Sequence, residues 1–391
     1  IYLIWKLRGR KMNFEYNEDQ LAIKDMAKGF SETELMPYAA DWDQNEIFPI
    51  KTLKKAAKLG LAAIYVNEAH GGSGLSRLDA AIIFEELSRG CVSTAAYISI
   101  HNMVTWMIDA HGSDAIKERF INKLSTMEIM SSYCLTEPGS GSDAVALKTS
   151  ASKKGNSHYI LNGSKSFISG GPTSDVFAVM CRTGEEGANG VSCLLVEKGT
   201  KGLSFGKQEK KMGWNSQHTS MVNFDNCEIP IDNLVGNEGD GFKIAMKGLD
   251  GGRVNIAACS LGGARAALEA SISYSAERKQ FGKSIDQFQV TQFKLADMAT
   301  ELEAARLMVL RAARSLDTHD SKATKLCAMA KRYATDICSE ICDMALQIHG
   351  GYGYLKDFPL ERLVRDLRVH QILEGTNEIM RVIISRDLKS N

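Results

Sequence analysis

The residue best suited to acid–base chemistry is Glu374, which follows the apolar pair Ile372-Leu373 and precedes a glycine. A carboxyl group pushed into an apolar cleft has a raised pKa, and it becomes a better base when a ligand excludes water. Thr376 or Asn377 could cap a helix that carries the apolar residues that follow. A glutamate near a helix start is otherwise commonly a capping or surface residue, so the local sequence leaves both interpretations open.

Three further segments could approach a ligand closely. Tyr133–Asp143 combines two glycines with small hydroxyl residues, so backbone N–H and side-chain O–H donors can reach a bound group. Lys165–Gly171 resembles a strand on which Phe167 offers a ring for stacking next to a hydroxyl. Gln347–Tyr354 ends a helical pattern in clustered glycines. Each segment also has an ordinary interpretation: a solvated loop, a core aromatic, and a structural histidine at His349.

Several standard motifs are missing from the sequence. It has no GxxxxGK[ST] phosphate loop, no HExxH, no GxSxG, and no GxGxxG after a strand, so a standard Rossmann unit is not expected. We predict no metal site. The nine cysteines include no CxxC pair. Although Cys338 and Cys342 are one helical turn apart, buried thiols in a reducing compartment are the better explanation.

The composition indicates a globular protein with more than one structural unit. A chain of 391 residues is too long for one ordinary compact unit. Lys+Arg and Asp+Glu are each 47, so no overall basic field for nucleic acid exists. The sequence has no stretch of 18 or more apolar residues, so we expect no membrane span. Residues 1–11 are basic and acid-free, like the end of an organelle transit peptide, but added upstream sequence would look the same.

Hydrophobic periodicity predicts helices first and strands in the middle. The first part includes helices at 51–60 and 77–90, each ending at a glycine. The middle part has short β-branched and aromatic runs, with strands expected at 159–161, 175–180, 191–196 and 220–224. Asn162-Gly163 predicts a tight hairpin turn, which we prefer to a glycosylation signal in the same tripeptide.

Helical periodicity returns after Gly241 and dominates the rest of the chain. Apolar residues step by three or four along 295–309 and 326–348, as in helices that bury one stripe in a bundle. We therefore expect a mainly α protein with a β middle domain. The expected parts are a basic extension (1–12), a helical domain (13–130), a β domain (131–236) and a helical bundle (237–391).

In this order and spacing, the motifs YCLTEPGSGSD, FISGG, RKQFG, QIHGGYGY and LEGTNEIM resemble those of the acyl-CoA dehydrogenase family. The resemblance covers about residues 14–388. It implies an N-terminal helical domain, a β-barrel-like middle domain and a C-terminal four-helix bundle. It also implies FAD bound between domains and across a subunit interface, a homotetramer, and electron-transferring flavoprotein as the partner that accepts electrons from acyl-CoA oxidation.

The same resemblance assigns roles to individual residues, with Glu374 as the catalytic base. The residues that match substrate-binding positions are Ser142, Asp250, Gly251, Gly252, Arg253 and Arg386. The residues that match cofactor-binding positions are Tyr133, Cys134, Leu135, Thr136, Gly139, Ser140, Gly141, Ser142, Phe167, Ile168, Ser169, Arg278, Phe281, Phe288, Gln289, Gln347, Ile348, His349, Gly350, Gly351, Thr376, Asn377 and Glu378. Among them, Gln347–Gly351 resembles the loop that touches FAD from a neighbouring subunit.

One branch point within the family can be checked in the sequence. Members specific for isovaleryl or long-chain substrates resemble each other in carrying the base just before the arginine that is Arg253 here. That position is Gly252, so the sequence disfavours those two subtypes. The finer resemblance, in Gly74–Asp79, Ala95–Met103 and Lys211–Gln217, is to members that act on isobutyryl-CoA in valine degradation, forming methacrylyl-CoA in the mitochondrial matrix.

Other functions stay open at this point. Within the family, 2-methylbutyryl-CoA or a short straight-chain acyl-CoA are the nearest alternative substrates, because one methylene changes discrimination by only ~1–3 kcal/mol. An oxidase would share the base but pass electrons to O₂, and such proteins usually carry a further C-terminal domain. A non-catalytic scaffold with the same fold is disfavoured because Glu374, Arg278 and the glycines of both cofactor loops are present.

Overall fold

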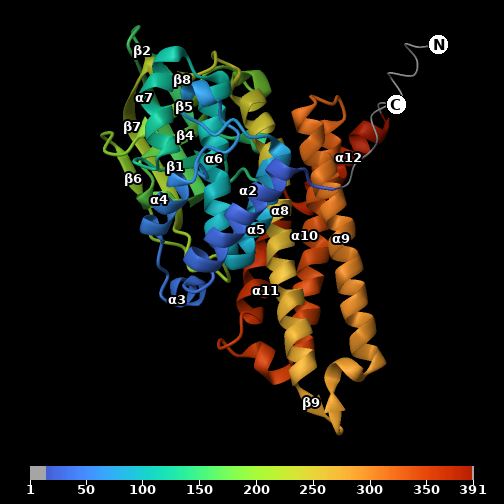
Figure 1. The fold of residues 1–391 in the computed structure, drawn as a ribbon. Helices are drawn as coiled ribbons and strands as arrows, with labels where there is room; N and C mark the ends of the chain where they lie inside the picture. Colours follow the sequence, from blue (N-terminus) through green and yellow to red (C-terminus); the bar gives the residue numbers. More distant parts are fainter. Residues whose placement is uncertain (1–14, 390–391) are drawn as a thin grey trace, which may run out of the picture.

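The computed structural model describes residues 15–389, and the basic segment 1–11 lies outside this range (Figure 1). Helices and strands follow each other as the sequence predicts: helical, then β, then helical. The N-terminal helices are α2 (Glu18–Phe30), α3 (Ala39–Gln44), α4 (Ile50–Lys58), α5 (Arg77–Gly90), α6 (Val92–His111) and α7 (Asp114–Ser125). A π-helical turn, Ser31–Leu35, extends α2.

The two glycines expected to end helices do so for different reasons. Gly60 follows α4 in the left-handed region (φ +78°), where a residue without Cβ is favoured. Gly90 is the last residue of α5 and has no positive φ. A Cβ there would lie 2.6 Å from Ser31 Oγ and 2.8 Å from its carbonyl oxygen, so Gly90 allows close approach of two helical segments.

The middle domain is one eight-stranded sheet in which β6 and β8 lie at the ends. The strands are β1 (Ser131–Cys134), β2 (Ser150–Lys154), β3 (His158–Ser169), β4 (Val176–Arg182), β5 (Val191–Glu197), β6 (Leu203–Phe205), β7 (Thr219–Pro230) and β8 (Leu234–Val235). They pair in the order β6-β7-β3-β2-β4-β5-β8, and β1 pairs in parallel with β4. Three of the four predicted runs fall within strands, and the fourth, 175–180, begins one residue before β4.

Strand β4 shows how the sheet joins its surroundings. Val176, Ala178 and Met180 pack into a core shared with α6, α7 and α8. The alternate residues Phe177 and Val179 pack into a separate core inside the β domain. A strand buried on both faces is expected to be apolar, and β4 is apolar and buried from Val176 to Cys181 before it ends in Arg182.

The hairpin turn predicted at Asn162-Gly163 is wrong. Both residues lie inside β3, where the pairing with β7 shifts register between Leu161 and Gly163. A Cβ on Gly163 (φ +142°) would lie 2.5 Å from Thr149 Oγ1, so this glycine marks a bulge with close approach of a neighbouring segment. The chain reverses instead between Lys154 and His158.

The C-terminal helices form a bundle that extends beyond the rest of the chain (Figure 1). They are α8 (Gly241–Glu277), α9 (Gln289–Asp317), α10 (Ala323–His349), α11 (Leu360–Arg368) and α12 (Asn377–Lys389). Two short strands, β9 (Lys279–Gln280) and β10 (Lys283–Ser284), form a hairpin between α8 and α9. No helix in residues 15–389 is long and apolar enough to span a bilayer.

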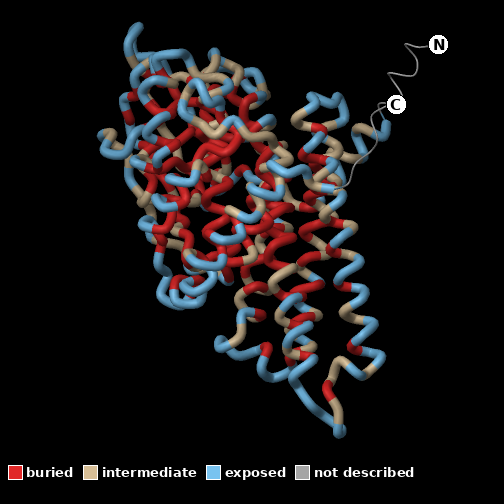
Figure 2. Tube along the Cα trace, in the orientation of Figure 1, coloured by how far each residue is buried: buried red, intermediate tan, exposed pale blue. Residues whose placement is uncertain are grey.

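The apolar stripe predicted for α9 matches its buried face, whereas the stripe predicted for α10 does not. Of the α9 stripe, Met298, Leu302, Ala305 and Val309 are buried, as predicted, and only Leu295 is partly exposed. On α10 most of the predicted large residues are half-buried, and the buried face consists mainly of smaller side chains: Cys327, Ala330, Ala334, Cys338, Cys342 and Ala345. Small side chains let the helices approach closely, and the outer ends of the helices stay exposed (Figure 2).

Candidate functional site

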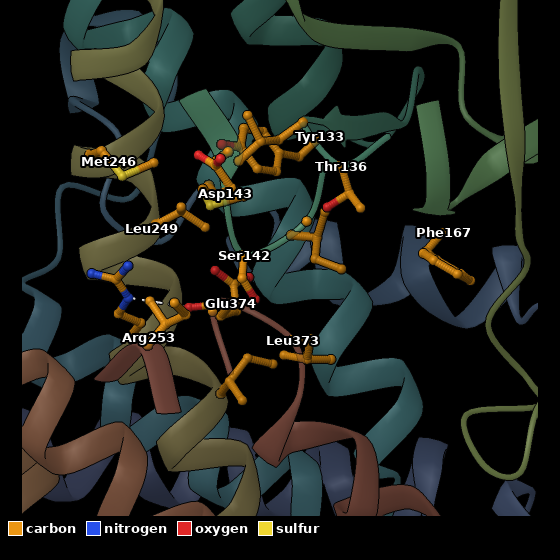
Figure 3. Close-up of a pocket in the computed structure, with 18 of the residues that line it drawn as sticks. Tyr133, Thr136, Ser142, Asp143, Phe167, Met246, Leu249, Arg253, Leu373 and Glu374 are labelled. Carbon is orange, nitrogen blue, oxygen red and sulfur yellow. Dashed lines mark hydrogen bonds between the residues drawn. The ribbon is translucent and has the colours of Figure 1, made fainter. Parts of the chain in front are cut away.

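A cavity of about 570 Å³ lies between the middle sheet and helices α6, α8 and α12. This volume is typical of small-molecule sites. Part of its wall is apolar, with side chains from helices α6 and α8: Ile100, Met103, Phe242, Met246 and Leu249, together with Leu373 before α12. Figure 3 shows Arg253 and Phe167 on opposite sides of Glu374 within this cavity.

The cavity brings together residues predicted from distant parts of the sequence. Its lining includes the following predicted residues: Tyr133, Leu135, Thr136, Gly141, Ser142, Phe167, Ile168, Ser169, Arg253, Glu374 and Arg386. They come from β1 and the loop after it, from the end of β3 and from α8. Glu374 lies in the loop before α12, and Arg386 lies within α12. The sequence predicted this convergence through resemblance and not through spacing.

A second group of predicted residues lies at the end of the bundle, near β9. Arg278, Ile348, His349, Gly350 and Gly351 line a hollow there, outside the lining of the first cavity. The His349 ring stacks on Tyr274 with the ring centroids 4.2 Å apart, and its Nδ1 lies 2.8 Å from the Ala345 carbonyl oxygen. One chain does not bring this group together with the first one.

The remaining predicted residues lie outside both hollows. Cys134 is wholly buried in the core of the β domain, so any contact that it makes with a ligand in the cavity would be through its backbone. Ser140 Oγ donates to the Asp143 carbonyl within a tight turn. The others lie at helix or strand ends or against other side chains: Gly139, Asp250, Gly251, Gly252, Phe281, Phe288, Gln289, Gln347, Thr376, Asn377 and Glu378.

Glu374 sits in a backbone conformation that needs support. It has φ +57° and is followed by Gly375 at φ +87°, so two successive residues occupy the left-handed region. Arg253 Nε donates to the Glu374 carbonyl (3.2 Å), and Lys331 Nζ donates to the Gly375 carbonyl (2.8 Å). Arg253 is itself fixed by Asp250, whose Oδ1 lies 2.7 Å from Nη1. Two cations therefore hold the loop by its backbone.

The Glu374 carboxylate is buried and incompletely hydrogen-bonded. Its Oε2 is inaccessible to water and has no partner among the described residues. Burial raises the pKa of Glu374 to about 7, and the positive charges of Arg253 and Lys331 partly oppose this rise. A base with a pKa near neutrality and a free lone pair can accept a proton from a ligand in the cavity.

Gly252 explains how the carboxylate fits against α8. A Cβ on Gly252 would lie 2.5 Å from Glu374 Oε2. The neighbouring Gly251 has a similar relation to Arg77, whose Nη1 would lie 2.4 Å from a Cβ. The Glu374 carboxylate therefore occupies the space that a side chain at position 252 would fill.

The opposite wall of the cavity is fixed by a second buried lysine. Lys165 is wholly buried on β3, donates to the Leu135 carbonyl (2.9 Å) and pairs with Glu137 (2.8 Å). The backbone N–H of Ser166 donates to the Thr136 carbonyl (2.8 Å). These contacts tie the Tyr133–Asp143 segment to β3, and Tyr133, Leu135, Thr136 and Gly141–Asp143 of this segment line the cavity.

Phe167 leaves the strand in a way that suits stacking. The β3–β7 register shifts between Lys165 and Ile168, and Phe167 has φ +59°. Its ring is 69% exposed although it lines the cavity. An exposed ring beside hydroxyl donors of Thr136 and Ser169 fits a planar, polar-edged cofactor better than it fits a packing role.

Sequence reasoning missed several lining residues and Lys331. Trp214, Met103 and Leu249 carry no signal that separates a cavity wall from an ordinary core. Lys331 could have been noticed in the sequence, because it is a charged residue at a helical spacing from Cys327 and Cys338, which lie on the buried face of α10. No group of three or more His, Cys, Asp or Glu in residues 15–389 is arranged to hold a metal ion.

Comparisons with known proteins give matches along nearly the whole chain. Residues 17–128, 132–227 and 239–389 match the models of the N-terminal, middle and C-terminal domains of acyl-CoA dehydrogenase. Mitochondrial isobutyryl-CoA dehydrogenase of Bos taurus is 56% identical over 372 residues, 95% of this chain and 89% of that one. The Dictyostelium discoideum protein of the same name is 54% identical over 96% of this chain and 90% of its own. The structure of butyryl-CoA dehydrogenase from Megasphaera elsdenii superposes with a TM-score of 0.93 at 36% identity, covering 97% of this chain and 100% of that one.

The contact between position 252 and the carboxylate can be tested by stability. We expect Gly252→Ala to lower the free energy of unfolding by about 1–3 kcal/mol in urea titrations, because the new methyl group displaces the carboxylate. Gly248→Ala on the same helix is the control. Its methyl group would lie 3.2 Å from the flexible Met107 side chain and should cost less. In a Glu374→Ala background the cost of Gly252→Ala should disappear; a cost that persists would contradict the assigned clash.

Proposed function

The chain belongs to the acyl-CoA dehydrogenase family, and on that premise we propose that it oxidises isobutyryl-CoA to methacrylyl-CoA in valine degradation, with Glu374 as the catalytic base. As a member of this family it is a flavin-dependent oxidoreductase that acts on the CH–CH bond of acyl-CoA thioesters. The observation that carries the role of Glu374 is the place of this residue in the cavity lining, with a carboxyl oxygen, Oε2, that is buried and has no partner among the described residues.

The reaction requires a base and a dry site, and the cavity provides both. The α-proton of an acyl thioester is weakly acidic, so a base must be strong near neutral pH and shielded from water. Glu374 meets these requirements because burial raises its pKa to about 7. Arg253 and Lys331 bind backbone oxygens of the loop, so they fix its direction and leave Oε2 available.

The wall made by β3 and the Tyr133–Asp143 segment fits the flavin. When bound, FAD supplies the acceptor for the hydride that leaves the β-carbon. The exposed Phe167 ring would stack against a planar ring system, and Thr136 and Ser169 would donate to its polar edge. Electron-transferring flavoprotein would be the partner that accepts the electrons of the reaction.

The second hollow supports a homotetramer. Arg278, His349 and Gly350 lie too far along the bundle to join the first cavity in one chain, and we propose that they complete the FAD site of a neighbouring chain. Phe281 fits this proposal because its ring is 94% exposed at φ +52°. An aromatic ring held open in this way is typical of a surface that a ligand or partner covers.

The substrate assignment rests on relatives and on the apolar wall. Met103, Leu249 and Leu373 present apolar surface near Glu374, which suits a short acyl chain. Ser142 and Arg386 line the same cavity and would bind the polar CoA portion. Both relatives named for isobutyryl-CoA are described as mitochondrial, so we place this protein in mitochondria and, within them, in the matrix.

Replacement of the base tests the mechanism. We expect Glu374→Gln to retain bound FAD, seen as the flavin absorbance, and to lose roughly 10²–10⁴-fold in kcat, because an amide cannot accept the α-proton. Glu340→Gln, on an exposed face of α10, is the matched control for loss of one carboxylate. Retention of most activity in Glu374→Gln would move the base to another residue.

A substrate panel tests the acyl preference. We expect kcat/KM with electron-transferring flavoprotein to be highest for isobutyryl-CoA among isobutyryl-, 2-methylbutyryl-, butyryl- and isovaleryl-CoA. Differences of about 10-fold to 200-fold are expected for one methylene. A higher value for butyryl-CoA would refute the valine-pathway assignment. Peroxide release at a comparable rate without added acceptor would instead identify an oxidase.

A further inference from the structure

Lys331 is a buried charge that the mechanism above uses only as a backbone donor. It lies on α10 behind the base, and its side chain is 0% exposed. Its Nζ donates to the Gly375 carbonyl and to Asn377 Oδ1, each at 2.8 Å. A buried ammonium is unfavourable unless it is hydrogen-bonded and faces negative charge, so its position calls for an explanation.

Lys331 is part of a hydrogen-bonded grip of α10 on the loop that carries Glu374. Asn377 Nδ2 donates to Thr335 Oγ1 (2.9 Å) and to Asp336 Oδ1 (2.6 Å). Gln371 Nε2 donates to the same Asp336 oxygen (2.9 Å). We call Lys331, Thr335 and Asp336 the α10 clamp. Lys331 and Thr335 are four residues apart and share one face of the helix, with Asp336 beside it. Together they hold the loop both before and after the base.

The loop needs this clamp because its own conformation is unfavourable. Glu374 lies in the left-handed region, which costs a non-glycine residue conformational energy. Tertiary contacts must supply that energy. Arg253 and the α10 clamp provide these contacts by hydrogen bonds to two successive carbonyl oxygens, those of Glu374 and Gly375.

The charge of Lys331 also acts on the base. Burial lowers the pKa of Lys331 to about 7, and the neighbouring carboxylate of Glu374 opposes this change. Besides Glu374, the ionisable groups that face Lys331 are Arg253, which lowers its pKa, and Asp336 and Glu378, which raise it. Burial and Lys331 together lower the pKa of His370 to about 3, so this histidine is neutral throughout the working range.

We propose that Lys331 is a positioning residue of the dehydrogenation: it holds the loop so that the Glu374 carboxylate points into the cavity, and it places a positive charge behind that carboxylate. The inference rests on the proposed role of Glu374 as the base. It predicts two separable effects when Lys331 is changed. Loss of the charge weakens the ionised form of Glu374, and loss of the hydrogen bonds lets the loop relax.

Proton exchange separates the base from the redox step. Acetyl-CoA has α-protons but no β-carbon, so it can be deprotonated and cannot be dehydrogenated. We therefore measure deuterium uptake into the acetyl group of acetyl-CoA by the holoenzyme in D₂O between pH 5 and 10, by mass spectrometry. Wild-type exchange should rise through pH 7 as Glu374 ionises, because only the carboxylate accepts a proton.

Three variants divide the two effects. Lys331→Gln keeps a hydrogen-bond donor without the charge. In the profile of exchange rate against pH, it should move the rise at acidic pH (the acidic limb) to higher pH by roughly one pH unit or more, with little change in the plateau rate at high pH. Lys331→Met removes both, so the limb should move and the plateau should also fall. Lys325→Met is the matched control on α10. Lys325 pairs with Asp387 and does not contribute to the pKa shift of Glu374, so the limb should stay in place.

The outcomes distinguish failure of this inference from failure of the proposed function. Exchange that survives in Glu374→Gln would show that the base lies elsewhere. With Glu374 established, an unmoved acidic limb in both Lys331 variants would overturn the inference. A uniform loss at every pH would also overturn it, because that is the result of a merely structural lysine. Flavin absorbance and circular dichroism identify any variant that does not fold, and Lys331→Gln then decides alone.

Discussion

The site depends on how one buried carboxylate is held. Arg253 and Lys331 donate to the backbone oxygens of the Glu374 loop, and Oε2 of the carboxylate has no partner within residues 15–389. Direct hydrogen bonds from both cations to the carboxylate would favour its ionised form and weaken it as a base. Holding the loop by its backbone fixes the direction of the side chain and keeps the pKa near neutrality, at a modest cost in backbone strain.

In the opposite wall of the cavity, a buried lysine also holds a loop by a backbone carbonyl oxygen, but this lysine has a carboxylate partner of its own. Lys165 also donates to a backbone carbonyl, that of Leu135, but it has its own carboxylate partner in Glu137. The charge of Lys165 is therefore satisfied locally and has no role in the acid–base chemistry. The two walls are anchored to separate elements, β3 and α10. The distance between cofactor and base therefore depends on the cores that join the middle sheet, α6 and α8.

The sequence predicted the order of elements, and it selected Glu374, which lines the cavity. Its failures have local causes. Asn162-Gly163 looked like a turn because a dipeptide carries no information about the strand that pairs with it. The stripe on α10 was displaced because small residues such as Ala330 and Ala334 permit closer packing than large ones. Lys331 was missed because a lysine within a helix is normally assigned to the solvent face. Convergence of four distant segments on one cavity was available only through resemblance.

The space shared by Gly252 and the Glu374 carboxylate has a consequence for how such proteins diverge. A side chain at one position excludes the acid at the other, because a Cβ on Gly252 would already lie 2.5 Å from Oε2. In this geometry a side chain at position 252 and the carboxylate of Glu374 therefore exclude each other. A chain that carried an acid at position 252 would need a smaller residue at position 374, so moving the carboxylate between the two positions would require both residues to change together.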